Sequence, residues 1–140
     1  IFLNTQKKLV INLMYKNLFI GNQLQSYQLF INVTNEINIK VGKLGRFFFP
    51  AGSYVYTGSA KKNIDKRIER HLSKKKNLHW HIDYLLNNDA VKIIYTKKSE
   101  MTECVLNKKT KGTIIIDGFG SSDCNLCCRS HLKFREISIS

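Results

Sequence analysis

SYVYTGSAKKNIDKRIERH, residues 53–71, contains a short strand, a tight break and a helix, and the rest of the chain supports or extends this stretch. Residues 54–57 alternate as a strand, and Gly58 then interrupts the pattern. The segment 60–75 has helical periodicity, because an apolar residue recurs at every fourth position. These apolar residues are Ile64, Ile68 and Leu72. We therefore predict a strand that leads directly into a helix.

The same helix is rich in basic side chains. Those of its opening turns and its far flank are Lys61, Lys62, Lys66, Arg70 and Lys74. Arg67 and His71 are four residues apart, at the border between the apolar stripe and the basic flank. A guanidinium and an imidazole in such a half-buried position suit a phosphate ligand, since they are both oriented and accessible. The alternative is a solvated basic helix without a specific ligand.

Periodicity elsewhere predicts a mixed fold. Residues 25–33 alternate as a strand with a strongly apolar face, and 37–41 are expected to return as the second arm of a hairpin. Further extended segments are expected at 46–49, 91–96, 113–116 and 131–134. Helices are expected at 79–86 and 99–109, the second with Met101, Cys104 and Val105 facing inward. The order of elements predicts an α+β fold with a small sheet.

The net charge is the strongest global feature of the chain. Lys and Arg number 23 against 10 Asp and Glu, which leaves +13 on 140 residues. We expect an anionic partner, nucleic acid rather than a membrane surface, with DNA favoured over RNA. The alternative is that the charge only aids solubility. A hydrophobic fraction of 43% indicates a folded globule.

The length fits one domain, which we expect over residues 23–140, with 1–22 as a peripheral N-terminal segment. No apolar run reaches membrane-spanning length, and residues 1–22 lack the apolar core and cleavage site of a signal peptide. We therefore expect a cytoplasmic protein without a membrane partner. As to assembly, we expect a monomer or a weak dimer.

Two further residues suggest phosphate chemistry. Tyr56 could place a phenol beside a scissile phosphate, and Gly58 would let the backbone approach it; the alternative is an ordinary strand aromatic. Glu103 lies among apolar neighbours in a chain with few acids. A single carboxylate completed by water and phosphate is typical of Mg²⁺, although a surface salt bridge is the alternative.

His79, His81 and Asp83 form a polar cluster around Trp80, which we expect in the core. The two histidines could bind a phosphate or a metal, with a structural role as the alternative. All four cysteines lie in the second half of the chain, at 104, 124, 127 and 128. Without a secretory signal, metal binding or free thiols are expected rather than disulfides.

Cys124, Cys127, Cys128 and His131 resemble half of a zinc site. They are crowded into eight residues, and the usual second pair of ligands is missing unless Cys104 contributes. The crowding argues against zinc, and a tight loop with buried thiols is the alternative.

Taken in order, several short sequence motifs of the chain resemble those of the GIY-YIG nuclease superfamily. They begin with Tyr27, Tyr56-Thr57-Gly58, Arg67, His71 and Glu103. One archaeal-type branch, known as a domain of unknown function and sometimes joined to endonuclease III, is similar over residues 24–135. The words that carry this closer resemblance are GKLG (42–45), PAGSYVYTGSA (50–60), RIERH (67–71), HWHIDYLL (79–86), EC (103–104), GFGSSDC (118–124) and SHL (130–132).

The resemblance implies a small antiparallel sheet flanked by helices and a metal-dependent DNA endonuclease that acts in repair or processing. Tyr27 and Tyr56 match the tyrosines of the two name-giving elements, Arg67 the catalytic arginine, His71 the histidine one turn later, and Glu103 the ligand of Mg²⁺ or Mn²⁺. The residues expected to contact the nucleic acid are Gly58, Lys61, Lys62, Lys66, Arg70, Lys74, His79 and His81.

The chain departs from the superfamily pattern in several places. The first element reads Gln25-Ser26-Tyr27 and lacks its glycine, Thr57 replaces an aliphatic residue, and the asparagine that many superfamily nucleases have after the metal-binding glutamate has no convincing equivalent. The absent glycine and asparagine favour an alternative function, a nucleic-acid-binding module that keeps the fold without turnover. A zinc-stabilised interaction domain is a third hypothesis.

Overall fold

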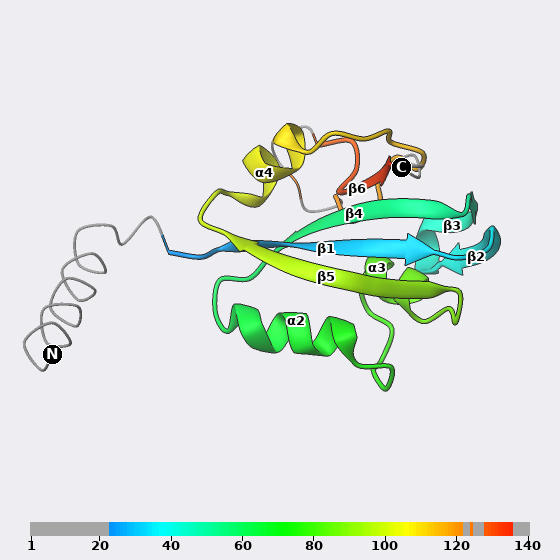
Figure 1. Ribbon diagram of the computed structural model, residues 1–140, viewed down its shortest axis with the longest axis horizontal. Helices are drawn as coiled ribbons and strands as arrows, with labels where there is room; N and C mark the ends of the chain where they lie inside the picture. The colour runs from blue at the N-terminus through cyan, green and yellow to red at the C-terminus, as the bar shows by residue number, and fades with distance from the viewer. Residues whose placement is uncertain (1–22, 122–123, 125–127, 136–140) are drawn as a thin grey trace, which may run out of the picture.

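The computed structural model describes residues 23–121, 124 and 128–135, so the expectation for residues 1–22 lies outside the described part (Figure 1). The strands are β1 (Ser26–Val33), β2 (Ile37–Val41), β3 (Gly45–Phe49), β4 (Gly52–Ser59), β5 (Val91–Ser99) and β6 (Leu132–Arg135). The helices are η2 (Gly42–Leu44), α2 (Ile64–Leu72), α3 (His81–Leu86) and α4 (Glu103–Lys109). β5, β1, β4 and β6 form one antiparallel sheet in that order, and β2 and β3 form a second sheet. The predicted α+β class, a small antiparallel sheet flanked by helices, is confirmed.

β1 is an inner strand of the main sheet and carries the strongest alternation in the sequence. Tyr27, Leu29, Ile31 and Val33 are each at most 2% exposed. β4 pairs with β1 along its whole length and places Gly58 opposite Tyr27. In Figure 1, α2 lies below the strands and α4 above them. The sheet therefore holds the first predicted tyrosine next to the glycine of the second predicted element.

The predicted hairpin between residues 25–33 and 37–41 is wrong in its partner. β2 pairs with β3, with Ile37 opposite Phe49 and Val41 opposite Gly45. Both edges of β1 are already occupied by β4 and β5, so β2 has no edge of β1 to join. Alternation identified the strands, but it does not specify which strand lies beside which.

The helices are shorter than their periodicity predicts. Asn63 has a left-handed backbone with φ of 55°, so α2 starts at Ile64 and not at residue 60, and it ends at Leu72 before the extended Ser73. β5 continues to Ser99, and the hydroxyl of Thr102 accepts the N–H of Val105 at the start of α4. The expected helix over 99–109 therefore loses its first four residues to strand and loop.

The structure corrects three expectations about which side chains are buried. Met101 and Val105, expected to face inward, are 40% and 43% exposed, and Leu72 of the predicted apolar stripe is 53% exposed. The segment 113–116 is not a strand, because Thr113 forms only a single bridge with Phe134.

None of the helices in the described ranges is long and apolar enough to cross a membrane.

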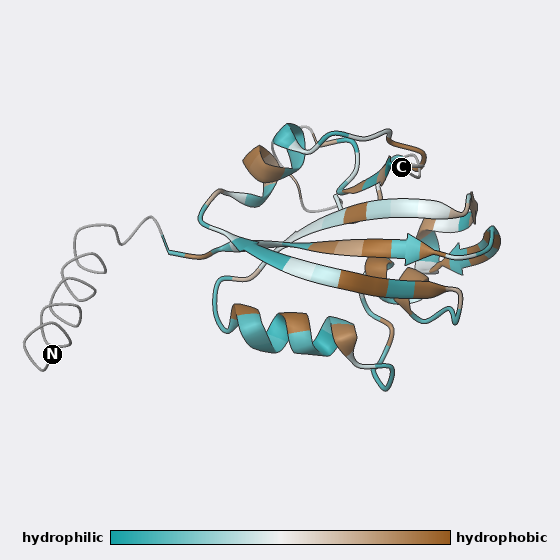
Figure 2. Ribbon diagram, viewed as in Figure 1, coloured by the Kyte–Doolittle hydropathy of each residue, from teal (hydrophilic) through white to brown (hydrophobic). Residues whose placement is uncertain are grey.

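The apolar core extends along the main sheet and is richest at one end. Figure 2 shows hydrophobic residues concentrated in the parts of β1 and β5 that approach β2, β3 and α3. Phe49, Ile82, Leu85 and Phe119, all 0% exposed, belong to this core. The opposite end, where β1 begins and β4 and β5 end, is more polar, and the candidate site lies there.

Candidate functional site

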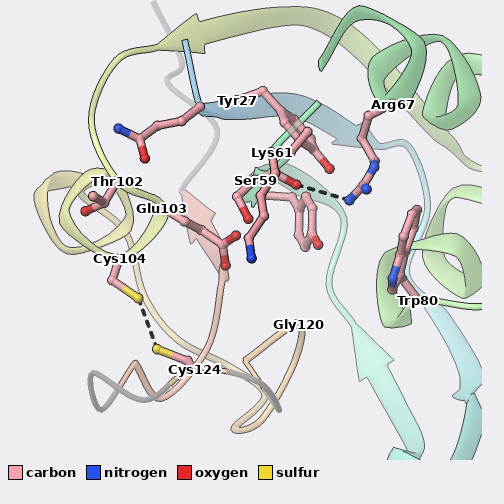
Figure 3. Close-up of a pocket in the computed structure, with 13 residues that line it drawn as sticks. Tyr27, Ser59, Lys61, Arg67, Trp80, Thr102, Glu103, Cys104, Gly120 and Cys124 are labelled. Atoms are coloured by element: carbon pink, nitrogen blue, oxygen red, sulfur yellow. Dashed lines mark hydrogen bonds between the residues drawn. The ribbon is translucent and has the colours of Figure 1, made fainter. Parts of the chain in front are cut away.

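A pocket of about 690 Å³ opens at the polar end of the sheet (Figure 3). Tyr27 of β1, Tyr56 of β4, Arg67 of α2 and Glu103 of α4 all line it. In Figure 3, Arg67 and Glu103 point into the pocket from opposite sides, with Lys61 between them. The structure thus brings four of the predicted site residues together from four separate elements.

His71, the fifth predicted catalytic residue, lies behind the pocket and does not line it. It is 2% exposed, whereas a half-buried position was predicted. The inward face of α2 is centred on Ile64, Ile68 and His71, which is why Leu72 turns outward. Nε2 of His71 and the Tyr27 hydroxyl share a buried hydrogen bond of 2.6 Å. His71 therefore orients Tyr27 and has no open path to a ligand.

Burial controls the protonation of this pair. Desolvation lowers the pKa of His71 to about 4, so the imidazole is neutral near pH 7. Burial also raises the pKa of Tyr27 and of Tyr56 above that of a free tyrosine, although the charge of Arg67 opposes the shift. Both phenols therefore keep their protons at neutral pH and act first as hydrogen-bond groups.

Gly58 explains how Tyr27 fits into the sheet. A Cβ at position 58 would lie 2.5 Å from both Cζ and the hydroxyl oxygen of Tyr27. Gly58 is buried and does not line the pocket. Its missing side chain makes room for the phenol of Tyr27. The backbone of Gly58 is not presented to a ligand, contrary to the prediction from the sequence.

Arg67 and Arg70 both contact Trp80, but they have different partners. Their guanidinium carbons lie 4.5 and 4.4 Å from the centre of the Trp80 ring. Arg67 also donates to the carbonyl of Ser59 at 3.1 Å and faces the pocket. Trp80, expected in the core, is half-buried and lines the pocket.

Arg70 is engaged inside the fold. Its two terminal nitrogens donate to the two carboxylate oxygens of Asp83, each at 2.9 Å. Asp83 is 0% exposed and also accepts the N–H groups of His79 and Trp80. Burial acts to raise the pKa of Asp83, yet these hydrogen bonds lower it below its usual value. Arg70 thus joins α2 to α3, whereas the sequence predicted that it contacts nucleic acid.

The other expected nucleic-acid contacts divide into two groups. Lys61, Lys62, Lys66 and His79 are exposed, and Lys61 lines the pocket. The Lys74 ammonium donates to the carbonyl of Leu86 at 3.0 Å. His81 accepts the N–H of Gly120 through Nδ1 at 2.9 Å, so it anchors the loop after residue 116. Lys74 is exposed as well, but its ammonium is already engaged with the main chain, and His81 is only half-exposed, so the first group suits a phosphate backbone best.

Glu103 has a partner that sequence reasoning missed. Its Oε1 lies 2.5 Å from Nδ1 of His131, whose side chain is 1% exposed. Burial acts to raise the pKa of Glu103, but the hydrogen bonds with His131 and Ser59 and the charge of Arg67 lower it. For His131, burial acts to lower the pKa and the pairing with Glu103 raises it to about 9. The sequence singled out His131 as a possible zinc ligand and as part of the motif SHL at 130–132, and neither signal pointed to Glu103.

Four potential metal ligands converge beside Glu103. The donor atoms of Cys104, Cys124, Cys128 and His131 all lie within 4.8 Å of one another. The sulfurs of Cys104 and Cys124 are 3.0 Å apart, and burial with the neighbouring thiols raises the pKa of Cys104 to about 12. Cys127 of the sequence-based set lies outside the described residues. The chain therefore has a cluster that could hold a metal ion, with Cys104 as a member.

Polar contacts hold α4, and with it Glu103, against the sheet. The Lys133 ammonium donates to the carbonyls of Asn107 and Thr110 at the end of α4, at 2.6 and 2.7 Å. The amide of Gln28, on β1, donates to the Thr110 hydroxyl at 2.7 Å. Alternation alone does not reveal this network, because Gln28 and Lys133 are buried polar residues on strands.

Comparison with known proteins identifies one family. A family model described as domain of unknown function DUF123 matches residues 26–139. None of the curated proteins matches the chain, and none of the solved structures does.

Proposed function

Because the chain belongs to the DUF123 family, whose function is unknown, we propose its activity from the pocket itself: a metal-dependent endonuclease that hydrolyses phosphodiester bonds in DNA. One observation carries the proposal. Tyr27, Tyr56, Arg67 and Glu103 are the residues that the resemblance to GIY-YIG nucleases connects with this chemistry, and all four line one pocket.

Charge supports a nucleic-acid substrate. The net charge of +13 attracts polyanions, and Lys61, which lines the pocket, is exposed, as are Lys62 and Lys66. Phosphate contacts made by such lysines should give an affinity that falls steeply as salt is added. The guanidinium of Arg67 has the planar geometry that binds two oxygens of one phosphate.

Tyr27 is the candidate for activating water. His71 fixes its hydroxyl through the 2.6 Å hydrogen bond, so the oxygen is oriented before substrate binds. Because burial keeps the proton on the phenol and keeps His71 neutral, the Tyr27 oxygen orients the attacking water by hydrogen bonding, without a proton transfer to His71. Arg67, across the pocket, stabilises the charge that develops on the phosphate.

Glu103 suits a hard divalent cation. Its carboxylate is ionised, lines the pocket and retains 24% exposure of its side chain. Mg²⁺ or Mn²⁺ held there would neutralise charge on the leaving oxygen of the phosphodiester.

The test is nicking of supercoiled plasmid by the full chain, with and without Mg²⁺ or Mn²⁺. Arg67→Ala and Glu103→Gln should lower the rate by about 10²-fold or more. Arg46→Ala and Glu36→Gln remove exposed groups of the same charge outside the pocket and should cut like wild type. Cleavage by Glu103→Gln at the wild-type rate would refute the assignment.

A second function, DNA binding without turnover, has one observation in its favour. One carboxylate oxygen of Glu103 is already paired with His131, which reduces its capacity for a metal. The absent glycine of the first element and the missing asparagine after the metal-binding glutamate point the same way. Binding without cleavage on plasmid, single-stranded, flap and abasic DNA would select this function over the endonuclease.

A further inference from the structure

We propose that Cys104, Cys124, Cys128 and His131 bind one structural Zn²⁺ and that Glu103 orients His131 from outside the coordination sphere. Two of its ligands, Cys104 and Cys124, also line the pocket of the proposed nuclease site, but the zinc proposal does not depend on cleavage. It also replaces the sequence-based ligand set, since Cys104 takes the place of Cys127.

The donor set favours zinc over the other common metals. Three sulfurs and one imidazole nitrogen form a set used by tetrahedral structural zinc sites, and thiolates disfavour Mg²⁺ and Ca²⁺. Zinc–sulfur bonds of about 2.3 Å place tetrahedral ligands roughly 3.5–3.8 Å apart. The donor atoms here all lie within 4.8 Å of one another, so small side-chain movements would complete the coordination sphere.

His131 has the arrangement expected of a metal ligand. Its side chain is 1% exposed, and its Nδ1 is held by Glu103 at 2.5 Å. Both ring nitrogens are buried without a hydrogen bond of regular geometry among the residues that the structure describes; Nδ1 is in ion-pair contact with Glu103, and Nε2 has no such contact with an acid. With Nδ1 occupied, Nε2 is the nitrogen left for a metal, which would displace any proton there. A carboxylate on the far ring nitrogen is the usual companion of a metal-bound histidine.

The fold also supplies a reason for a cross-link at this place. Cys104 is in the first turn of α4, Cys124 and Cys128 follow the loop after residue 116, and His131 precedes β6. Between α4 and β6, the described residues include only one bridged position, Thr113. A metal bound by these ligands would tie the loop to α4 and would fix Glu103, the neighbour of Cys104, at the edge of the pocket.

The first experiment measures metal in the wild-type full chain, purified without a metal-affinity step from zinc-supplemented cells. We expect one zinc per chain by elemental analysis, and a lower melting temperature after chelation. Cobalt should replace zinc and give the intense visible bands of a tetrahedral thiolate site. A protein without zinc that also fails to take up cobalt would overturn the proposal. So would iron in place of zinc, or a disulfide between Cys104 and Cys124 in the freshly purified protein.

Variants then test the ligand set. Cys104→Ser and Cys128→Ser should lose the metal, whereas Cys127→Ser should keep one zinc per chain. Glu103→Gln should retain the site with zinc affinity lowered about 10- to 100-fold, as expected for a group that acts through a ligand. Loss of zinc from Cys127→Ser with retention by Cys104→Ser would reverse the assignment.

The metal measurements do not depend on DNA cleavage, so either proposal can fail without the other. Arg67→Ala is the useful link between them, because Arg67 is not a member of the cysteine–histidine cluster. That variant should lose nicking and keep its zinc.

Discussion

Replacing Gly58 with alanine should destabilise the protein, because the new methyl group would collide with Tyr27. The Cβ would lie 2.5 Å from Cζ and from the hydroxyl oxygen, where ordinary contacts are 3.4–4 Å. The Tyr27 ring would have to move by roughly 1 Å, yet it is 2% exposed and tied to His71 by a 2.6 Å hydrogen bond. The backbone at Gly58 is that of an ordinary paired strand, so strain in the main chain does not contribute.

The expected magnitude follows from three opposing effects. Overpacking of a core costs about 1–3 kcal/mol, and loss of the Tyr27–His71 hydrogen bond about 1 kcal/mol more. Alanine gains about 0.5–1 kcal/mol over glycine in a regular strand. Gly58→Ala should therefore lower the free energy of unfolding by about 1–3 kcal/mol, which urea denaturation followed by circular dichroism can measure.

A double-mutant cycle isolates the cause. Tyr27→Leu removes Cζ and the hydroxyl, so in that background Gly58→Ala should become neutral or stabilising. The coupling between the two positions should be about 1–3 kcal/mol. An equal cost of Gly58→Ala in both backgrounds would refute the reasoning, because it would show that Tyr27 is not the group displaced.

Two more predictions concern buried charge. Burial lowers the pKa of His71 from 6.5 to about 4, so the unfolded chain binds more protons than the folded one between those pH values, and stability should fall as pH falls through this window. The loss in the free energy of unfolding should be on the order of 3 kcal/mol at full effect. Urea unfolding at several pH values should show that this free energy depends less on pH in His71→Leu than in the wild type. Equal pH dependence in the two proteins would contradict the lowered pKa of His71. Asp83→Ala should cost about 2–4 kcal/mol, below the full range for a buried pair because Arg70 is 29% exposed. Asp65→Ala, which breaks only the exposed pair with Lys98, should cost less than about 1 kcal/mol, and an equal cost at both positions would contradict a special role for Asp83.

Most secondary-structure elements could be predicted from periodicity, and their boundaries and partners could not. The alternation of β1 is strong because Tyr27, Leu29, Ile31 and Val33 all face the core. The start of α2 depends on the left-handed Asn63, a conformation that the surrounding helical pattern conceals. The partner of β2 depends on which edges of β1 are free, and that is a property of the whole sheet.

The candidate site was predictable only in part. Resemblance to a known superfamily named Tyr27, Tyr56, Arg67 and Glu103, and the fold brings all four to one pocket. The helical wheel placed Arg67 and His71 together at the border of the apolar stripe and Arg70 on the basic flank beyond them. Docking of α2 separates them, since Arg67 faces the pocket, Arg70 pairs with Asp83 and His71 is buried behind Tyr27.

The sequence by itself determined the α+β class and the basic charge, because these follow from local periodicity and composition, and the candidate site residues came from the resemblance to a known superfamily. Only the tertiary structure decided that Glu103 pairs with His131 and that Cys104 joins Cys124 and Cys128. It also decided that Gly58 serves Tyr27 and is not presented to a ligand. The physical reason is the same in each case: these contacts join segments far apart in the chain, and their geometry exists only after the sheet and helices have packed together.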